Sequence, residues 1–313
     1  MRICLIGNFT KSYGQICDER HIADALKEIG QEVHCIQRED FPSRIAEFDK
    51  LKIDATIFFK WTGFTVEHIV RWKKITNAPV FAWTFDFMLY HENFLPVLHE
   101  VDCWLGEELG LLPDWARRGF NFHYFPNHAV PESIFKHLEF SKEYDVVFTG
   151  TYYPRGGRLD IIHELGRHYK VHVFGNGYPD WNKLGVVGHP PMFDEQFPEV
   201  IAKSKIVLGI NVQNETWGYW SIRPAQILMC GGFTIQKYIP GMEKELKDGC
   251  AYWHELPDLI EQIKYYLEHE EERIKISQRG YEIAHQNLTA KERARELIVL
   301  LKEYPKFKYY NPI

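Results

Sequence analysis

Short apolar runs alternate with amphipathic segments along most of the chain. The first half contains runs with the length and continuity of buried strands. They lie at residues 2–6, 32–36, 53–59, 79–83, 101–105 and 120–125. Helical spacing of apolar residues over 17–29 and 66–72 predicts helices between them. This alternation is typical of βαβ units on a mostly parallel sheet.

A polar segment bracketed by Pro126 and Pro131 interrupts the alternation, as an interdomain linker would. The pattern then restarts. Strands are expected at 145–149, 171–174, 206–210 and 233–236, and helices at 158–165, 197–203, 256–267 and 271–284. A last helix is expected from Thr289, with Glu292 completing a capping box, to about Tyr304. We therefore predict an α/β protein with domains at 1–130 and 131–288, and a closing helix and tail at 289–313.

The overall composition narrows the class of protein. Hydrophobic residues make up 45% and charged residues 26%, as in soluble globular proteins. The net charge of −6 provides no global field that favours nucleic acid or anionic membrane. The six cysteines are scattered, and no apolar run approaches a signal peptide or transmembrane helix. We expect a cytoplasmic protein with reduced thiols.

The most informative motif is the stretch from 206 to 233. A buried strand leads into a polar, aromatic loop, and a helix that ends at Gly231 and Gly232 follows. Ligands of open α/β sheets bind at such strand ends, and helix N-termini attract phosphate. We expect Ser221 and Arg223 to bind phosphate and Gln226 to contact a ribose hydroxyl. The alternative is a capped, solvated helix start.

Two other loops follow strands of the second half. In the first, Gly150 permits close approach of a ligand, and Arg155 and Arg158 can pair with a diphosphate. The alternative is a surface arginine on a flexible loop. In the second, the amide of Asn176 can contact a base edge, although a plain turn is the favoured explanation of this motif by itself.

Aromatic residues cluster near Asn211 in the long loop. They are Trp217, Tyr219 and Trp220. Aromatic residues are more often core or interface residues, but the neighbouring asparagines and Glu215 favour contacts with a sugar.

In the first half, Asp86 ends a strand and is a candidate general base, and His128 lies on the linker. Glu19 starts the first helix, where a capping role suffices. Lone acids and histidines are more often structural. No histidine and carboxylate spacing indicates a metal site.

With these residues in place, the chain resembles two-domain glycosyltransferases of the GT-B fold. The second half is most similar to the CgeB/YkvP type of glycosyltransferase domain, near family 4. Ser221, Arg223 and the segment 230–232 match that domain's donor-site helix. Gln226 stands where glutamate is usual, and Gly218 occupies the position of a second glutamate found in retaining relatives.

The resemblance implies two Rossmann-like domains facing a cleft, with the closing helix returning to the first domain. It implies a nucleotide-sugar in the second domain, UDP- or GDP-linked, with no cofactor and no metal. Arg158, Arg223, Ser221 and Gly150 would stabilise the leaving diphosphate. Asn176 and Gln226 would hold the nucleoside, and Tyr219, Trp220 and Asn211 would face the sugar.

The acceptor is expected to be a glycan, small molecule, protein or modified DNA. One alternative is a phage-type transferase that acts on a hydroxylated DNA base. The acidic pI counts against it, and a basic groove, built for example from Arg71, Lys73 and Lys74, would revive it. Others are a catalytically inactive sugar-binding or structural coat protein, or another nucleotide-sugar enzyme such as an epimerase.

Overall fold

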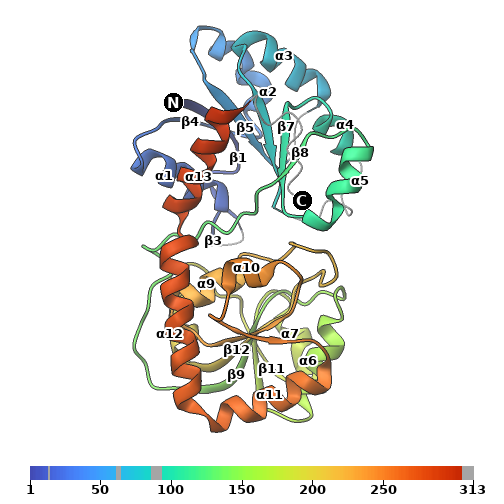
Figure 1. Cartoon of the computed structure of the whole chain (residues 1–313), viewed down its shortest axis with the longest axis vertical. Helices are drawn as coiled ribbons and strands as arrows, with labels where there is room; N and C mark the ends of the chain where they lie inside the picture. Colours follow the sequence, from blue (N-terminus) through green and yellow to red (C-terminus); the bar gives the residue numbers. More distant parts are fainter. Residues whose placement is uncertain (13–14, 61–64, 86–93, 305–313) are drawn as a thin grey trace. The chain divides into compact units, whose positions relative to one another are not determined.

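The structure is a computed structural model that describes residues 1–12, 15–60, 65–85 and 94–304. The chain forms two compact units. Unit 1 contains Met1–Ala129, Trp217–Tyr219 and Ala290–Ile313, and unit 2 contains Val130–Thr216 and Trp220–Thr289. Each unit has its own sheet with helices packed on it (Figure 1).

Unit 1 is built on a six-stranded parallel sheet in the order β4-β1-β5-β6-β7-β8. Its strands are β1 (Arg2–Gly7), β4 (Glu32–Gln37), β5 (Ala55–Phe59), β6 (Val80–Trp83), β7 (Cys103–Gly106) and β8 (Phe122–Tyr124). Its helices are α1 (Asp18–Glu28), α2 (Phe41–Arg44), η1 (Ile45–Lys50), α3 (Val66–Thr76), α4 (Leu95–Leu98), η4 (Leu109–Leu111), α5 (Leu112–Arg117) and α13 (Ala290–Glu303). The short strands β2 (Lys11–Ser12) and β3 (Gln15–Ile16) form a separate hairpin.

Both faces of the central strands of this sheet are buried, which explains why β1, β5, β6 and β7 are nearly continuous apolar runs. Along β1, Ile3 and Leu5 belong to one core cluster, and Cys4 and Ile6 belong to the other. Side chains of a strand alternate between its faces, so one strand supplies both cores.

Unit 2 repeats the architecture with a parallel sheet in the order β11-β10-β9-β12-β13-β14. Its strands are β9 (Tyr144–Thr149), β10 (Val171–Phe174), β11 (Val187–His189), β12 (Ser204–Gly209), β13 (Thr234–Lys237) and β14 (Ala251–Trp253). Its helices are α6 (Arg158–Gly166), α7 (Tyr178–Trp181), η5 (Asn182–Leu184), α8 (Gln196–Lys203), α9 (Arg223–Met229), α10 (Met242–Leu246), α11 (Leu256–Glu268) and α12 (Glu270–Asn287).

The predicted α/β class with two Rossmann-like units is confirmed. Within the two six-stranded sheets, the strands β11 and β14 were absent from the prediction. Each has three residues, and every residue of β11 is only half-buried, so neither forms a clear apolar run. Their place in the sheet comes from pairing with β10 and β13.

The closing helix α13 belongs to unit 1, as the resemblance implies. It lies beside α1 (Figure 1), and Ala294, Leu297 and Leu301 are buried in the same core cluster as Ile22 and Leu26 of α1. None of the helices in the described ranges has both the length and the apolar character needed to cross a bilayer.

Candidate functional site

The strand order of unit 2 identifies where a ligand should bind. From β9 the chain proceeds outward to β10 and β11, and it then returns to place β12 on the other side of β9. The order in which successive strands are added to the sheet therefore reverses between β9 and β12. Open α/β sheets bind ligands beyond the carboxyl ends of the strands at such a switch point. The loops after β9 and β12 both carry predicted site residues.

These two loops are in direct contact. Gly156 adopts φ +69°, and its carbonyl accepts a hydrogen bond from Nδ2 of Asn214 at 3.1 Å. A Cβ at Gly156 would lie 2.5 Å from the carbonyl oxygen of Asn211, so a side chain does not fit. Glycine is required here both for its backbone conformation and for the close approach.

Arg158 binds to the backbone of both loops. It is the first residue of α6 and is buried, with its guanidinium over the ring of Phe148. Nη1 donates to the carbonyl of Thr151 at 3.1 Å, and Nη2 donates to the carbonyl of Ile210 at 3.0 Å. Arg158 is thus a tie between the loops, and its direct contact with a diphosphate stays a prediction.

Arg155 differs from Arg158 in being exposed. Its guanidinium lies 5.6 Å from the ring centre of Tyr153. Gly150 is tied into the structure, because its N–H donates to the carbonyl of Phe174 at 2.9 Å. Any diphosphate contact by Gly150 therefore needs a group other than this N–H.

Asn211 and Ser221 form the polar centre of the long loop. Oδ1 of the buried Asn211 accepts the N–H of Ser221 at 3.1 Å. Nδ2 of Asn211 and Oγ of Ser221 are both buried, and neither has a hydrogen-bond partner in the described part of the chain. A buried polar group left unpaired costs about 1–3 kcal/mol. Both atoms belong to the same loop, so a polar ligand bound at this strand end could satisfy them.

Capping does not explain Ser221. The residue before α9 is Ile222, and no side chain caps the helix. Arg223 begins α9, and Gln226 lies within it; both are half-buried. The structure thus brings Asn211, Ser221 and Arg223 together around one strand end.

Asn176 is exposed on the loop after β10. Its carbonyl accepts the N–H of Tyr152 at 2.8 Å, so the loops after β9 and β10 remain paired beyond the sheet.

The aromatic residues of the long loop are mostly buried. Trp220 lies in a core cluster of unit 2, and Tyr219 is buried in the segment that groups with unit 1. In unit 1 the carbonyl of Trp217 accepts the N–H of Gly110 at 2.8 Å, and that of Gly218 accepts the hydroxyl of Tyr124 at 3.1 Å. Contact of Tyr219 and Trp220 with a sugar stays a prediction.

In unit 1, Asp86 lies outside the described residues. His128 is fully buried, and the N–H of the adjacent Asn127 donates to Oε1 of Glu107 at 2.9 Å.

The sequence prediction assigned Glu19 only a capping role, yet it is buried beside the end of β1. Its Cγ would lie 3.1 Å from a Cβ at Gly7. Burial raises the pKa of this carboxyl, an effect opposed first by the charge of Lys60. Lys60 follows β5 with φ +44°, a conformation that is uncommon outside glycine. β1 and β5 flank the switch point of the unit 1 sheet.

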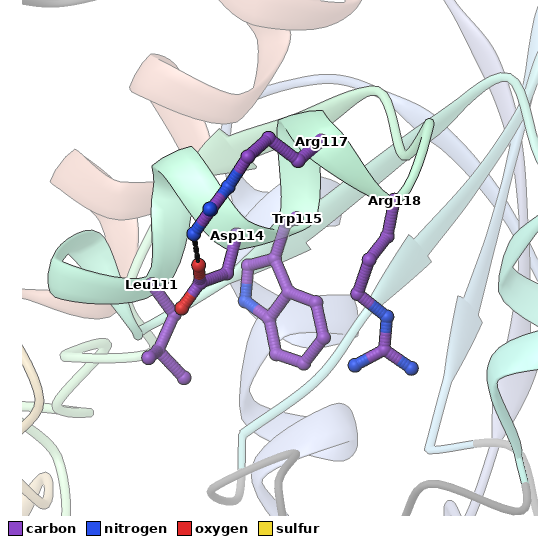
Figure 2. Close-up of a pocket in the computed structure, with 5 residues that line it drawn as sticks. All are labelled: Leu111, Asp114, Trp115, Arg117 and Arg118. Atoms are coloured by element: carbon purple, nitrogen blue, oxygen red, sulfur yellow. Dashed lines mark hydrogen bonds and ion pairs between the residues drawn. The ribbon is translucent and has the colours of Figure 1, made fainter.

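A hollow of about 300 Å³ lies on α5 of unit 1 (Figure 2). Arg117 is paired with Asp114 there, and the guanidinium of Arg118 lies 5.1 Å from the ring centre of Trp115. No residue from the sequence prediction lines it.

The argument for a basic groove on α3 is weakened, because Nζ of Lys73 is paired with Asp102 at 2.8 Å. Within the described residues, no three His, Cys, Asp or Glu side chains gather as a metal site requires.

Comparisons with known proteins agree with this arrangement. Residues 158–299 match a family model described as glycosyl transferase-like. No curated protein matches the chain in sequence. Among solved structures, Anabaena HepE in complex with UDP has a TM-score of 0.69 at 13% identity, covering 97% of this chain and 100% of that chain.

Two further structures are similar over nearly the whole chain. Sucrose-phosphate synthase from Thermosynechococcus elongatus has a TM-score of 0.73 at 11% identity, covering 96% of this chain and 98% of that chain. A T4 phage BGT mutant in complex with UDP-glucose has a TM-score of 0.63 at 13% identity, covering 99% and 100%. At these identities the likeness shows the fold, and the chain has the GT-B fold. The CgeB/YkvP assignment stays a prediction.

Proposed function

We propose that this protein is a glycosyltransferase that moves a sugar from a nucleoside-diphosphate sugar to an acceptor hydroxyl. The observation that carries the proposal is the pair of unpartnered buried atoms, Nδ2 of Asn211 and Oγ of Ser221, at the switch point of unit 2. Further support comes from the family match, which includes Ser221, and from the UDP and UDP-glucose complexes among the structural neighbours.

In this proposal the diphosphate lies over the β9 and β12 loops. Oγ of Ser221 and Nδ2 of Asn211 donate to it, and the guanidinium groups of Arg223 and Arg155 neutralise its charge. Arg158 acts as a positioning residue that holds both loops together. Fixed donors stabilise charge that develops on the leaving group, and they take the role a metal has in other transferases. If the reaction inverts the anomeric configuration, Asp86 would accept the proton of the acceptor hydroxyl.

Ser221→Ala provides the sharpest test, because its two expected effects have opposite signs. Removal of an unpartnered buried hydroxyl should leave the ligand-free protein as stable as before or slightly more stable. Loss of a hydrogen bond to a charged phosphate, about 1.5–3 kcal/mol, should weaken UDP or GDP binding roughly 10- to 100-fold. Thermal denaturation and isothermal titration calorimetry measure the two effects, with and without a chelator.

Ser204→Ala is the matched control. Its Oγ donates to the carbonyl of Val200 at 2.6 Å, so its loss should lower stability by about 1 kcal/mol and leave nucleotide binding unchanged. Equal nucleotide affinity in wild type and Ser221→Ala would contradict the proposed donor site. Strict dependence on a divalent cation would contradict metal independence. Binding of a nucleotide-sugar without any release of nucleotide would favour the inactive sugar-binding alternative.

A second candidate is transfer to a hydroxylated DNA base, for which exposed basic residues of α3 are the supporting observation. Arg71 and Lys74 of α3 are exposed, whereas Lys73 is already paired. Binding to duplex DNA that weakens steeply with salt would support this acceptor.

A further inference from the structure

A nucleoside-diphosphate sugar has a charged centre and a flat base at one end. The polar residues at the β9 and β12 loops provide for the charged centre. Large aromatic side chains are exposed near the loops after β9 and β10. Tyr153, on the β9 loop, is 39% exposed, and Tyr178, after the β10 loop, is 41% exposed. Exposed aromatic rings at a strand-end site are natural surfaces for stacking a base.

The backbone places these two tyrosines on adjoining loops. The N–H of Gly150 binds the carbonyl of Phe174, and the N–H of Tyr152 binds the carbonyl of Asn176 at 2.8 Å. A Cβ at Gly177 would lie 2.7 Å from Cβ of Tyr152. Tyr153 and Tyr178 are the next residues after this contact in their loops. Pro179 follows Tyr178 within the first turn of α7 and restricts its backbone.

The two rings differ in what already lies against them. Tyr153 already has the guanidinium of Arg155 5.6 Å from its ring centre, so one face receives a planar cation. Tyr178 makes no ring contact with any aromatic side chain in the described ranges. By contrast, the neighbouring Tyr152 is half-buried and packs edge-on against Trp181 at 5.1 Å, which fits a role in the fold.

We propose that Tyr153 and Tyr178 form the platform on which the base of the donor nucleotide stacks. The inference rests on the proposed function and adds the direction of the donor in the site. The base lies over the loops of β9 and β10, and the diphosphate and sugar extend toward Ser221 on the β12 side. The exposed Asn176 lies on the loop after β10, shortly before Tyr178.

The test compares a nucleotide with a probe that has no base. Calorimetry on the full chain would use UDP, ADP and GDP, with pyrophosphate as the probe without a base. In Tyr178→Ala, and more strongly in the double variant with Tyr153→Ala, affinity for the bound nucleotide should fall about 10- to 100-fold. Pyrophosphate affinity should stay unchanged, and the Tyr→Phe variants, which keep the ring, should bind like wild type.

Tyr265→Ala is the matched control, because Tyr265 is 43% exposed in the same unit but on α11. If wild type binds none of the nucleotides, the proposed function fails and the platform with it. If wild type binds and the alanine variants bind equally well, the platform is overturned while the function stands. An equal loss for pyrophosphate would show that the tyrosines shape the loop instead, and would also overturn the platform.

Discussion

At the scale of single residues, Glu19 is a buried acid in unit 1. It is 2% exposed at the start of α1, and burial raises the pKa of its carboxyl. A raised pKa means that folding favours the protonated form. The resulting stability is fully present below the ordinary pKa of about 4.5 and is lost as pH rises through the folded pKa.

Glu19→Gln should therefore stabilise the protein at pH 8, raising Tm by roughly 2–4 °C for each kcal/mol gained, with little effect at pH 4. Thermal denaturation at both pH values measures this difference. Asp18→Asn, at the neighbouring half-buried acid of the same helix, provides the control. A lower Tm for Glu19→Gln at pH 8 would show that the carboxylate is stabilising as an ion. If the acid has a catalytic use, donor turnover should fall while stability rises.

The positions of the candidate residues at strand ends could be read from the sequence, and their roles stay predictions. Ser221, Arg223 and Asn211 were predicted because a strand, a polar loop and a helix follow one another in the chain. The role of Arg158 as a tie was not predictable, because its partners Thr151 and Ile210 lie on two different loops. The burial of Glu19 was not predictable for a similar reason, since Gly7 at the end of β1 lies beside it.

At the scale of elements, a histidine pair joins the edge strand β11 to β10. Nδ1 of His172 lies 2.9 Å from Nε2 of His189, and the rings are stacked. Burial lowers the pKa of both histidines. The charges of His189 and Lys170 lower the pKa of His172 further, and the charge of Asp145 opposes this shift. The sequence showed no sign of this pair, because β11 itself was missed.

This pair should make the edge of unit 2 sensitive to acid. A lowered histidine pKa gives stability that is present above the ordinary value of 6.5 and is lost as pH falls through it. Wild type should lose stability between pH 7.5 and 5, and His172→Phe should show a flatter profile. Amide hydrogen exchange in β10 and β11 would follow the change locally. Parallel pH profiles for both proteins would contradict the prediction.

At the scale of the whole molecule, the alternation of apolar runs was sufficient to predict two α/β units. It was not sufficient to predict that Trp217–Tyr219 groups with unit 1, because that depends on backbone bonds to Gly110 and Tyr124. The closing helix was expected from the family resemblance and its capping box, and its burial against α1 bears this out.

We expect Leu297 on this helix to contribute as much to the stability of unit 1 as a buried residue of its sheet. It is fully buried, so Leu297→Ala should cost about 2–5 kcal/mol in the free energy of unfolding. Val299→Ala, on the exposed face of the same helix, should change stability by less than about 0.5 kcal/mol. Urea denaturation with limited proteolysis would show which unit opens. Selective exposure of unit 2 would contradict the assignment of α13.

The return of α13 also sets an order of events during synthesis. All the strands of unit 1 leave the ribosome before the first strand of unit 2, yet the helix that completes the unit 1 core is translated after the whole of unit 2. Domains commonly fold in the order in which they are made. We therefore expect unit 1, which is synthesised first, to complete its folding last, because one face of its core stays uncovered until α13 is synthesised.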